Sequence, residues 1–493
     1  MRSFRDLRCS FFNKLFTFMS LLMFISCEEE TLPEAVLSIQ NVRVVNMDDF
    51  SVSEPSRVVV DGDSIILIVA ADEELQYKVS KTWDANGGYL IPGLWDMHAH
   101  PDDPELWRLN PDRSSRDLLM PLFVLEGVTG IRDMGGSLEE VTHWRNSYKQ
   151  DSLLCPKIVA AGPLLDGPDP MWDGSVGIKS ADEVPKVVDS IMEAGADFLK
   201  VYSKLPADIF HALSQYAREN DIPFVGHVPY EITPTEAALA GMKSQEYLLE
   251  ILKQVTGPLP DSLKIEMEKI TDPVSSWVMV NNYRLDHINT SLLDSVIGIF
   301  ATEKIWHCPT LSMWYKNAWY EEELEKDKAL IPELPMYLQR YWTPDENDHL
   351  KHRDREDFIE VKKELYEFYA FLVKRMKQSG VKLLAGTDTG ANPLCFPGVG
   401  VHNELAALVK AGLTPGEALR TATLNPAIFL EIDDHYGRVS KGYKADLVIL
   451  VNNPLEDILN TRKIQAVVRD GKLIGAGEID KRKAEIFMKQ GVN

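Results

Sequence analysis

The sequence predicts an α/β protein in which a (β/α)8 TIM barrel is joined to a small β-sandwich made from both ends of the chain. Between residues 91 and 432, short apolar runs alternate with helical stretches, a pattern typical of parallel βα units. Both chain ends contain β-branched runs instead. Histidine, lysine and aspartate residues follow several of the apolar runs directly, at the strand ends where such barrels carry their active sites.

Eight apolar runs are the candidate barrel strands, which is the number that closes a barrel of this type. They are Leu90–Met97, Gly127–Arg132, Lys157–Ala161, Ala196–Val201, Pro223–His227, Lys243–Glu246, Lys304–Thr310 and Val381–Thr387. The stretch from about 249 to 372 is longer than a barrel loop requires, so we expect an insertion that acts as a lid or a substrate wall. A solvated surface helix fits its Glu- and Lys-rich part equally well.

The β-sandwich is predicted to be discontinuous in sequence. Its first part is residues 36–90, where two β-branched runs are separated by turn residues. Its second part is residues 433–480, where the run 464–477 folds back at an Asp470-Gly471 hairpin turn. Residues 481–493 are assigned to a C-terminal tail.

The first 26 residues are predicted to be a lipoprotein signal peptide. A basic start precedes an apolar run over Phe11–Ile25, and the small residue Ser26 then stands directly before Cys27. Cys27 would carry the lipid, residues 27–35 would be a tether, and the protein would be anchored in a bacterial cell envelope, in the periplasm or at the outer-membrane surface. A single-pass anchor is the alternative, although the run is short and contains Lys14.

Composition excludes several function classes. The 493-residue chain has a formal net charge of −23, which argues against nucleic acid as a partner because phosphate contacts require clustered Lys and Arg. Beyond Cys27 the cysteines are too few and too scattered for a disulfide framework. Neither a Gly-x-Ser-x-Gly motif nor phosphate-loop spacing occurs, so we expect no nucleotide cofactor. The oligomeric state is not predicted.

A divalent metal site is the strongest chemical signal. His98 and His100 are separated by one residue at the end of an apolar run, and side chains two apart on a strand share a face. Two adjacent imidazoles suit a divalent metal. Lys200, His227 and Asp388 each stand at the polar end of another apolar run, so a barrel would bring all five together.

Several longer motifs accompany these residues. They are "LIPGLWDMHAH", "GVTGIRDMGG", "ADFLKVYSK", "PFVGHVP", "IWHCPTL", "LLAGTDTG", "ELAALVKAGLTPGEALRTATLNPA" and "GRVSKGYKADLVIL". Over roughly residues 36–478 the chain resembles the amidohydrolase superfamily of metal-dependent hydrolases, most of all its imidazolonepropionase-like and dipeptidase-like branch.

The resemblance implies a role for each candidate. His98, His100 and Asp388 would bind one metal, and Asp388 would also accept a proton from the attacking water. Lys200 would be carboxylated and would bridge two metals, or would instead form a salt bridge with an acid in the pocket. His227 would bind the second metal, unless it is a hydrogen-bonded core histidine.

One position departs from the family pattern. The sixth barrel strand of the family ends in Glu-His, whereas this chain has Tyr247 at the histidine position. A phenol is a poor ligand near neutral pH because its pKa is about 10. We therefore expect one firmly bound metal, held by His98, His100 and Asp388 with help from Lys200, and a doubtful second one. Zinc fits the N and O ligands best, with Mn, Fe, Co and Ni also open.

Other polar residues are weaker candidates. Tyr230 follows His227 and could donate a hydrogen bond to a substrate carboxylate, while Arg132 ends the second strand and could face the substrate or support the site. His402 opens the helix after the last strand and could contact substrate or simply begin that helix. His307 is interpreted as structural.

These residues together predict a hydrolase that cleaves C–N amide bonds of small substrates such as dipeptides, N-acyl amino acids or cyclic amides. Metal-activated water would attack, and Asp388 would shuttle the proton. A catalytically impaired ligand-binding lipoprotein of the same fold is one alternative, supported by Tyr247. A lactonase or phosphoesterase is another.

Overall fold

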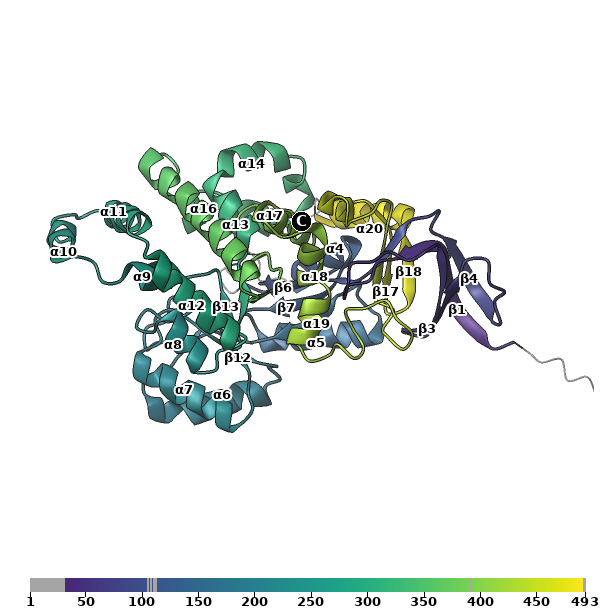
Figure 1. The fold of residues 1–493 in the computed structure, drawn as a ribbon, viewed down its shortest axis with the longest axis horizontal. Coiled ribbons are helices and arrows are strands. Elements are labelled where there is room, and N and C mark those ends of the chain that lie inside the picture. Colours follow the sequence, from purple (N-terminus) through teal and green to yellow (C-terminus); the bar gives the residue numbers. More distant parts are fainter. Residues whose placement is uncertain (1–31, 104–105, 107–108, 110–112, 391, 491–493) are drawn as a thin grey trace, which may run out of the picture.

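The computed structural model describes residues 32–103, 106, 109, 113–390 and 392–490 (Figure 1). Ten parallel strands form two sheets at its centre. The smaller sheet consists of β6 (Leu94–Ala99), β7 (Val128–Asp133) and β8 (Lys157–Ala160). The larger sheet, in the order β10-β9-β11-β12-β13-β14-β15, consists of β9 (Leu165–Asp166), β10 (Val176–Gly177), β11 (Leu199–Val201), β12 (Phe224–Gly226), β13 (Ser244–Glu246), β14 (Trp306–Cys308) and β15 (Lys382–Leu383).

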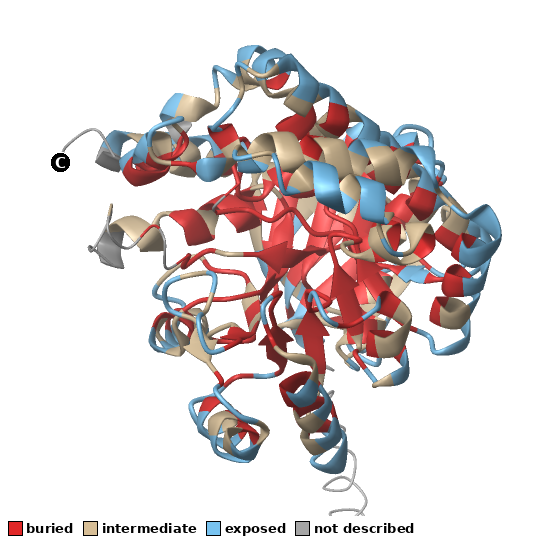
Figure 2. Ribbon diagram, turned by 90° about the vertical axis from the view of Figure 1, so that its left-hand side faces the viewer, coloured by how far each residue is buried: buried red, intermediate tan, exposed pale blue. Residues whose placement is uncertain are grey.

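Backbone hydrogen bonds connect the two sheets on both sides. On one side, the Met97 amide donates to the Ala385 carbonyl oxygen and the His100 amide donates to the Thr389 carbonyl oxygen, both at 2.8 Å. On the other side, the Asp197 amide lies 2.8 Å from the Ala160 carbonyl oxygen. The strands therefore form a TIM-barrel-like α/β fold, with buried strands inside and exposed helix faces outside (Figure 2).

Helices cover the strands. Outside the insertion they are α3 (Arg113–Asp117), α4 (Leu119–Leu125), α5 (Leu138–Gln150), α6 (Val184–Glu193), α7 (Ala207–Glu219), α8 (Pro234–Leu239), α17 (Val399–Lys410), α18 (Pro415–Thr421), α19 (Leu424–Phe429) and α20 (Ala476–Gln490). The sequence fixes where some of them begin: α8 and α18 start at capping boxes made by Thr233 with Glu236 and by Thr414 with Glu417, which satisfy first-turn amides.

The insertion is richer in helices than the sequence patterns indicated. Besides β14, it holds α9 (Ile251–Thr256), α10 (Asp261–Met267), α11 (Pro273–Asp286), α12 (Thr290–Thr302), α13 (Leu311–Ala318), α14 (Tyr320–Asp327), α15 (Met336–Tyr341) and the start of α16 (Glu356–Gln378). Tyr315, Trp319 and Tyr366 pack ring on ring, with centroids 4.7 to 5.3 Å apart, and so join α13 to α16.

Strands from both chain ends form one eight-stranded sheet, as expected for a unit shared by the two ends. Its strands are β1 (Glu34–Val44), β2 (Ser56–Asp61), β3 (Ser64–Ala70), β4 (Lys78–Asp84), β5 (Tyr89–Pro92), β16 (Leu447–Leu450), β17 (Ile464–Arg469) and β18 (Lys472–Gly475). β16 pairs antiparallel with β5, so the two ends meet there. Asp470 and Gly471 have φ of 52° and 73°, which confirms the predicted hairpin turn. A two-layer sandwich stays a prediction.

Most of the predicted barrel strands are shorter or shifted in the structure, as in β15, which covers only Lys382–Leu383 of the expected Val381–Thr387, and three further differences stand out. The run Leu90–Met97 is split at Gly93 because β5 pairs with β1 and β16 in the sheet of the chain ends, whereas β6 pairs with β7 in the central sheet. Strands β9 and β10 were not predicted. The final strand ends at Gly475, and most of the expected tail belongs to α20, where charged and apolar residues alternate at helical spacing.

The predicted signal peptide and Cys27 lie outside the described residues. Within the described part, no helix has both the length and the apolar character that crossing a membrane requires.

Candidate active site

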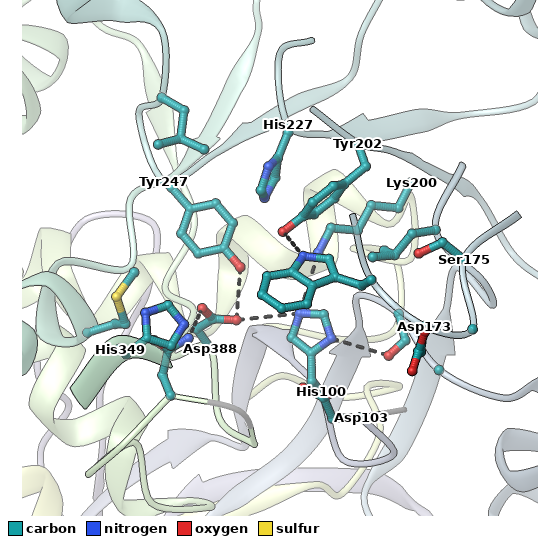
Figure 3. A pocket seen from close by; sticks show the side chains of 18 of the residues that line it. His100, Asp103, Asp173, Ser175, Lys200, Tyr202, His227, Tyr247, His349 and Asp388 are labelled. Atoms are coloured by element: carbon teal, nitrogen blue, oxygen red, sulfur yellow. Dashed lines mark hydrogen bonds and ion pairs between the residues drawn. The ribbon is translucent and has the colours of Figure 1, made fainter. Parts of the chain in front are cut away.

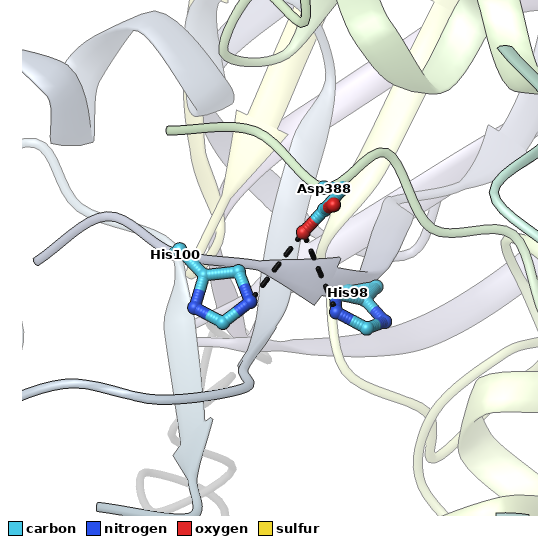
Figure 4. Close-up of side chains that lie close together, drawn as sticks. All are labelled: His98, His100 and Asp388. Atoms are coloured by element: carbon cyan, nitrogen blue, oxygen red, sulfur yellow. Dashed lines mark ion pairs between the residues drawn. The ribbon is translucent and has the colours of Figure 1, made fainter. Parts of the chain in front are cut away.

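His98, His100 and Asp388 converge at one end of the strands, as predicted (Figure 4). The Nε2 atoms of His98 and His100 lie 3.5 and 3.4 Å from Asp388 Oδ1. The His100 Nδ1 atom lies 3.2 Å from the Gly135 carbonyl oxygen, so it carries the proton and leaves Nε2 directed at the cluster. One ligand atom from each of the three residues falls within 4.8 Å of the others, which suits a single metal ion.

The backbone around Asp388 is tightly determined. Asp388 has a left-handed φ of 58°, and its amide donates a 2.7 Å hydrogen bond to the His98 carbonyl oxygen. The Asn392 amide group donates to the Asp388 carboxylate, and burial raises the pKa of that carboxyl to about 6 against the opposing effect of Lys200. Nearby, a Cβ atom on Gly386 would lie 2.4 Å from Cys308 Sγ and 2.5 Å from His98 Cβ, so only glycine fits there.

A buried ion pair supports His98 from behind. Its Nδ1 atom lies 2.9 Å from Glu246 Oε2, and Arg132 donates to both Glu246 oxygens at 2.9 and 3.0 Å. The Ser244 hydroxyl donates a 2.6 Å bond to the same carboxylate. Because a carboxylate accepts only, His98 Nδ1 carries the proton and Nε2 keeps its lone pair for the cluster. Sequence reasoning did not single out Glu246, although it is the Glu of the Glu-His pattern.

Tyr247 is directed at the first metal position. Its hydroxyl donates a 2.9 Å hydrogen bond to Asp388 Oδ1 (Figure 3). The same oxygen lies 2.8 Å from His98 Nε2. Toward His227 it presents only the ring, with centroids 5.0 Å apart. Burial raises the pKa of Tyr247 well above its usual value, so the phenol keeps its proton. The replacement of histidine therefore moves a hydroxyl group into the His98–Asp388 cluster.

Lys200, on β11, is buried beside the cluster. Its ammonium nitrogen lies 3.4 Å from His100 Nε2, and no carboxylate among the described residues forms an ion pair with it. Burial lowers the pKa of Lys200 to about 8. The salt-bridge alternative is therefore not what the structure contains, and carboxylation of Lys200 stays a prediction.

His227 follows β12 and is only partly hydrogen bonded. Its Nδ1 atom lies 2.8 Å from the Ser203 hydroxyl, and its ring stacks on Tyr202 with centroids 3.9 Å apart. The Nε2 atom is buried and has no hydrogen-bond partner among the described residues. Both ring nitrogens of His307 are equally unpaired in the described part of the chain, so what distinguishes His227 is its place in the cavity lining, where the nitrogen is accessible to a ligand.

A cavity of about 260 Å³ lies over the cluster (Figure 3). Asp388, Lys200 and His227 are on its floor side, and its wall is largely aromatic and apolar, with residues from the loop before β10 and from the insertion. Prominent wall residues are Leu164, Trp172, Tyr202, Met313 and Trp314. Residues of the insertion therefore line part of this cavity, and their role as a substrate wall stays a prediction.

None of the three predicted substrate contacts is among the residues that line this cavity. Arg132 is fully buried and bonded to Glu246, and it also donates a 2.6 Å bond to the Met97 carbonyl oxygen, so it positions the site instead. His402 is buried between the Thr461 hydroxyl and the Glu126 carbonyl oxygen, at 2.9 and 3.0 Å. It therefore links α17 to the chain at Thr461 and to the end of α4. Tyr230 is 50% exposed and lies outside the lining. His307 is buried outside the cavity lining, its ring packs against Phe300 with centroids 4.6 Å apart, and its structural role stays a prediction.

Comparisons with known proteins agree with this architecture. The profile of the amidohydrolase family matches residues 367–474. Ochratoxinase of Aspergillus niger is 36% identical over 480 residues, covering 85% of this chain and 83% of the relative. Imidazolonepropionase of Flavobacterium johnsoniae is 20% identical over 473 residues, covering 90% of this chain and 98% of that protein.

Two solved structures share the fold. A Xaa-Pro dipeptidase with bound methionine in its active site is 18% identical with a TM-score of 0.64, covering 89% of this chain and all of that one (100%). A bottromycin amidohydrolase is 20% identical with a TM-score of 0.70, covering 92% and 91%. With the identity to ochratoxinase across most of both chains, these findings show that the chain belongs to the amidohydrolase family and is a hydrolase acting on carbon–nitrogen amide bonds.

Proposed function

We propose that the protein is a metal-dependent hydrolase that cleaves the C–N amide bond of small substrates, namely dipeptides, N-acyl amino acids or cyclic amides. One observation carries this proposal. Two imidazole Nε2 atoms and the Asp388 carboxylate converge within 3.5 Å at the floor of an apolar cavity. A cavity of about 260 Å³ accommodates a small molecule and not a long polypeptide.

The residues of the cluster fit a divalent metal. Burial lowers the pKa of His98 and of His100 well below the usual value, so both rings are neutral, which is the form that binds metals. The Tyr247 hydroxyl has one proton, which it donates to Asp388, so its oxygen and His98 Nε2 face each other at 2.8 Å with lone pairs. A cation bound by His98 Nε2 and Asp388 would engage the His98 lone pair and remove that conflict.

His98, His100 and Asp388 would hold the metal, with Lys200 next to them, and zinc is the ion that this ligand set favours. When bound, the metal would polarise the scissile carbonyl group and activate a water molecule. Asp388 takes the proton of that water on its carboxylate and passes it to the leaving nitrogen. Asn392 and Tyr247 hold the carboxylate in place, and Glu246 keeps the His98 ring in orientation.

A second metal is proposed to bind weakly. Carboxylated Lys200 and His227 would supply its ligands, and the unpaired His227 Nε2 atom supports that position. The missing third ligand argues against tight binding, because the Tyr247 hydroxyl is engaged with Asp388 and His98.

Metal content and hydrolysis test the proposal together. Protein that begins at Glu28, purified without chelators or a histidine tag, is analysed for elements and assayed for amine release from dipeptides and N-acyl amino acids. About one metal equivalent per chain and chelator-sensitive amine release are expected. Metal-free protein that neither binds added zinc nor releases amine would contradict the proposal and favour the ligand-binding lipoprotein. Faster cleavage of lactones or phosphoesters than of amides would favour the alternative of a lactonase or phosphoesterase.

The cellular location is also proposed. Ser26-Cys27 after an apolar run supports a lipid anchor on Cys27 in a bacterial cell envelope. Incorporation of labelled palmitate that is lost in Cys27→Ser is the expected result, and labelling that survives the substitution would rule the anchor out. The joined parallel sheets likewise support a closed (β/α)8 barrel over residues 91–432, and the sheet of the chain ends supports the β-sandwich.

A further inference from the structure

Lys362 is a cationic side chain on the cavity wall that has no carboxylate partner among the described residues. It lies on α16, the long helix that closes the insertion, and its ammonium nitrogen is 4.6 Å from the centroid of the Phe358 ring one helical turn earlier. Two neighbouring cations of the insertion form ion pairs instead. Arg353 pairs with Glu321 at 2.6 Å, and Lys316 pairs with Asp327 at 2.5 Å.

An unpartnered cation in this place is unfavourable for the free protein. Burial, together with the nearby Arg353 charge, lowers the pKa of Lys362 to about 8. The group is still protonated for the most part at neutral pH, yet it has given up much of its hydration without forming an ion pair, because the Glu321 carboxylate that attracts it is paired with Arg353. An anion that enters the cavity would restore the missing interaction.

The charges of the cavity are separated in space. Asp103 and Asp173 lie on the His100 side, whereas His349 lies on the other side of Asp388 (Figure 3). His349 comes from the same insertion as Lys362, and burial with the Lys362 charge lowers its pKa to about 4, so it is neutral. The insertion wall therefore has one net positive charge, and the opposite wall is acidic.

We propose that Lys362 binds a free carboxylate of the substrate, so that the preferred substrates are amides that carry a carboxylate, such as N-acyl amino acids and dipeptides. The inference rests on the proposed amide hydrolysis and narrows its substrate class. The carboxylate contacts the Lys362 ammonium group while the amide carbonyl lies over the His98–His100–Asp388 cluster. An apolar or aromatic substrate side chain packs against the apolar part of the cavity wall, which includes Trp172 and Trp314. Cyclic amides without a carboxylate bind less well.

Two probes of the same shape test the charge. N-acetyl-L-phenylalanine carries a carboxylate, and N-acetyl-L-phenylalanine amide replaces it with a neutral carboxamide. Their dissociation constants are measured by calorimetry on the full-length, metal-loaded protein, and acetate release is followed in parallel. We expect the carboxylate probe to bind about 10- to 100-fold more tightly, the range for a charge-assisted hydrogen bond.

Lys362→Met keeps the aliphatic stem and removes the charge, so the preference for the carboxylate probe should disappear while carboxamide binding is unchanged. Lys363→Met is the matched control, because Lys363 is the next residue of α16, lies 5.5 Å from the centroid of the Trp319 ring and is absent from the cavity lining. It should retain the preference. Lys362→Arg should retain most of it, since the positive charge remains.

Two results would overturn the assignment. One is equal binding of both probes to the unmodified protein, which needs no variant to fold. The other is a preference that survives in Lys362→Met, even if acetate is released. A preference that depends on Lys362 together with no hydrolysis of any amide supports the carboxylate site and overturns the proposed reaction, so the two failures are distinguishable.

Discussion

His98 and His227 stand on two sides of the same site and are supported in different ways. His98 is backed by the Glu246 carboxylate, which two hydrogen bonds from Arg132 and one from Ser244 hold in place. His227 has a single neutral partner, the Ser203 hydroxyl, and its Nε2 atom is unpaired among the described residues. Charge-assisted contacts orient a ligand more firmly than one neutral hydrogen bond. The comparison teaches that the side chain at the proposed first metal position is held rigidly, whereas the one at the proposed second position is free to adjust.

Removing the shared carboxylate should have the largest effect on the His98 side. Asp388→Asn is expected to lower kcat by about 10²- to 10⁴-fold, because it eliminates the proton acceptor at the point where both Nε2 atoms meet. Amide hydrolysis is followed by amine release, and the melting temperature should change little. Asp173→Asn, on the exposed rim of the same cavity, is the control and should keep most of the activity. Turnover retained in Asp388→Asn would exclude the proton shuttle.

Breaking the buried ion pair tests the rigid support. Arg132→Met leaves the Glu246 charge buried without its partner, so the free energy of unfolding should fall by about 3–5 kcal/mol. Urea unfolding measures the change. Lys78→Met is the matched control because its pair with Glu34 is 76% and 77% exposed, and it should alter stability by no more than about 1 kcal/mol. Equal effects in the two variants would mean that the Arg132–Glu246 pair is not a special support.

Changing Tyr247 should sharpen the contrast between the two metal positions. Tyr247→His is expected to raise the metal content from about one equivalent per chain toward about two, because a neutral imidazole binds metals far better than a protonated phenol. Elemental analysis after dialysis provides the count. Tyr247→Phe removes the hydroxyl without adding a ligand and should stay near about one equivalent. A count that is the same in all three proteins would show that position 247 is not the missing ligand position.

The smallest effect is expected on the adjustable side. Ser203→Ala removes the partner of His227 Nδ1 and should cost about 1 kcal/mol of unfolding free energy while the tightly bound metal is unchanged. Chemical unfolding and elemental analysis check the two halves of this statement. Ser214→Ala, whose hydroxyl bonds to the His211 carbonyl oxygen at 3.0 Å on α7, provides the comparison. Loss of the tightly bound metal in Ser203→Ala would contradict the proposed difference between the His98 side and the His227 side.

The ligand cluster could be predicted from sequence because parallel strands end at a common edge. A residue placed just after a strand, such as His98 or Asp388, therefore has a determined location even when its partners are far away in the chain. The alternation of short apolar runs with helical stretches also located most of the buried central strands. The same rule could not predict that Arg132 binds Glu246 and does not line the cavity, because a position at a strand end does not determine which group the side chain contacts.

Other features depend on tertiary structure that leaves little local signal. Tyr247 follows its strand with a left-handed φ of 62°, which turns the hydroxyl toward Asp388 and away from the second metal position. Lys362 lies on a helix whose periodicity predicts burial of one face but not which cavity that face meets. The short strands β9 and β10, of two residues each, are defined by pairing with neighbours and not by their own composition.

The absence of a side chain at Gly386 has a consequence for how variation in this family is interpreted. A single methyl group there would have to displace either Cys308 or the strand that carries His98. Residues of the cavity wall can therefore be substituted while the ligand cluster is preserved, but Gly386 cannot be replaced even by alanine. A screen for inactive variants would recover Gly386→Ala together with substitutions of the reactive residues. Gly386 would then score like a catalytic residue, although its role is to leave space and not to take part in the reaction.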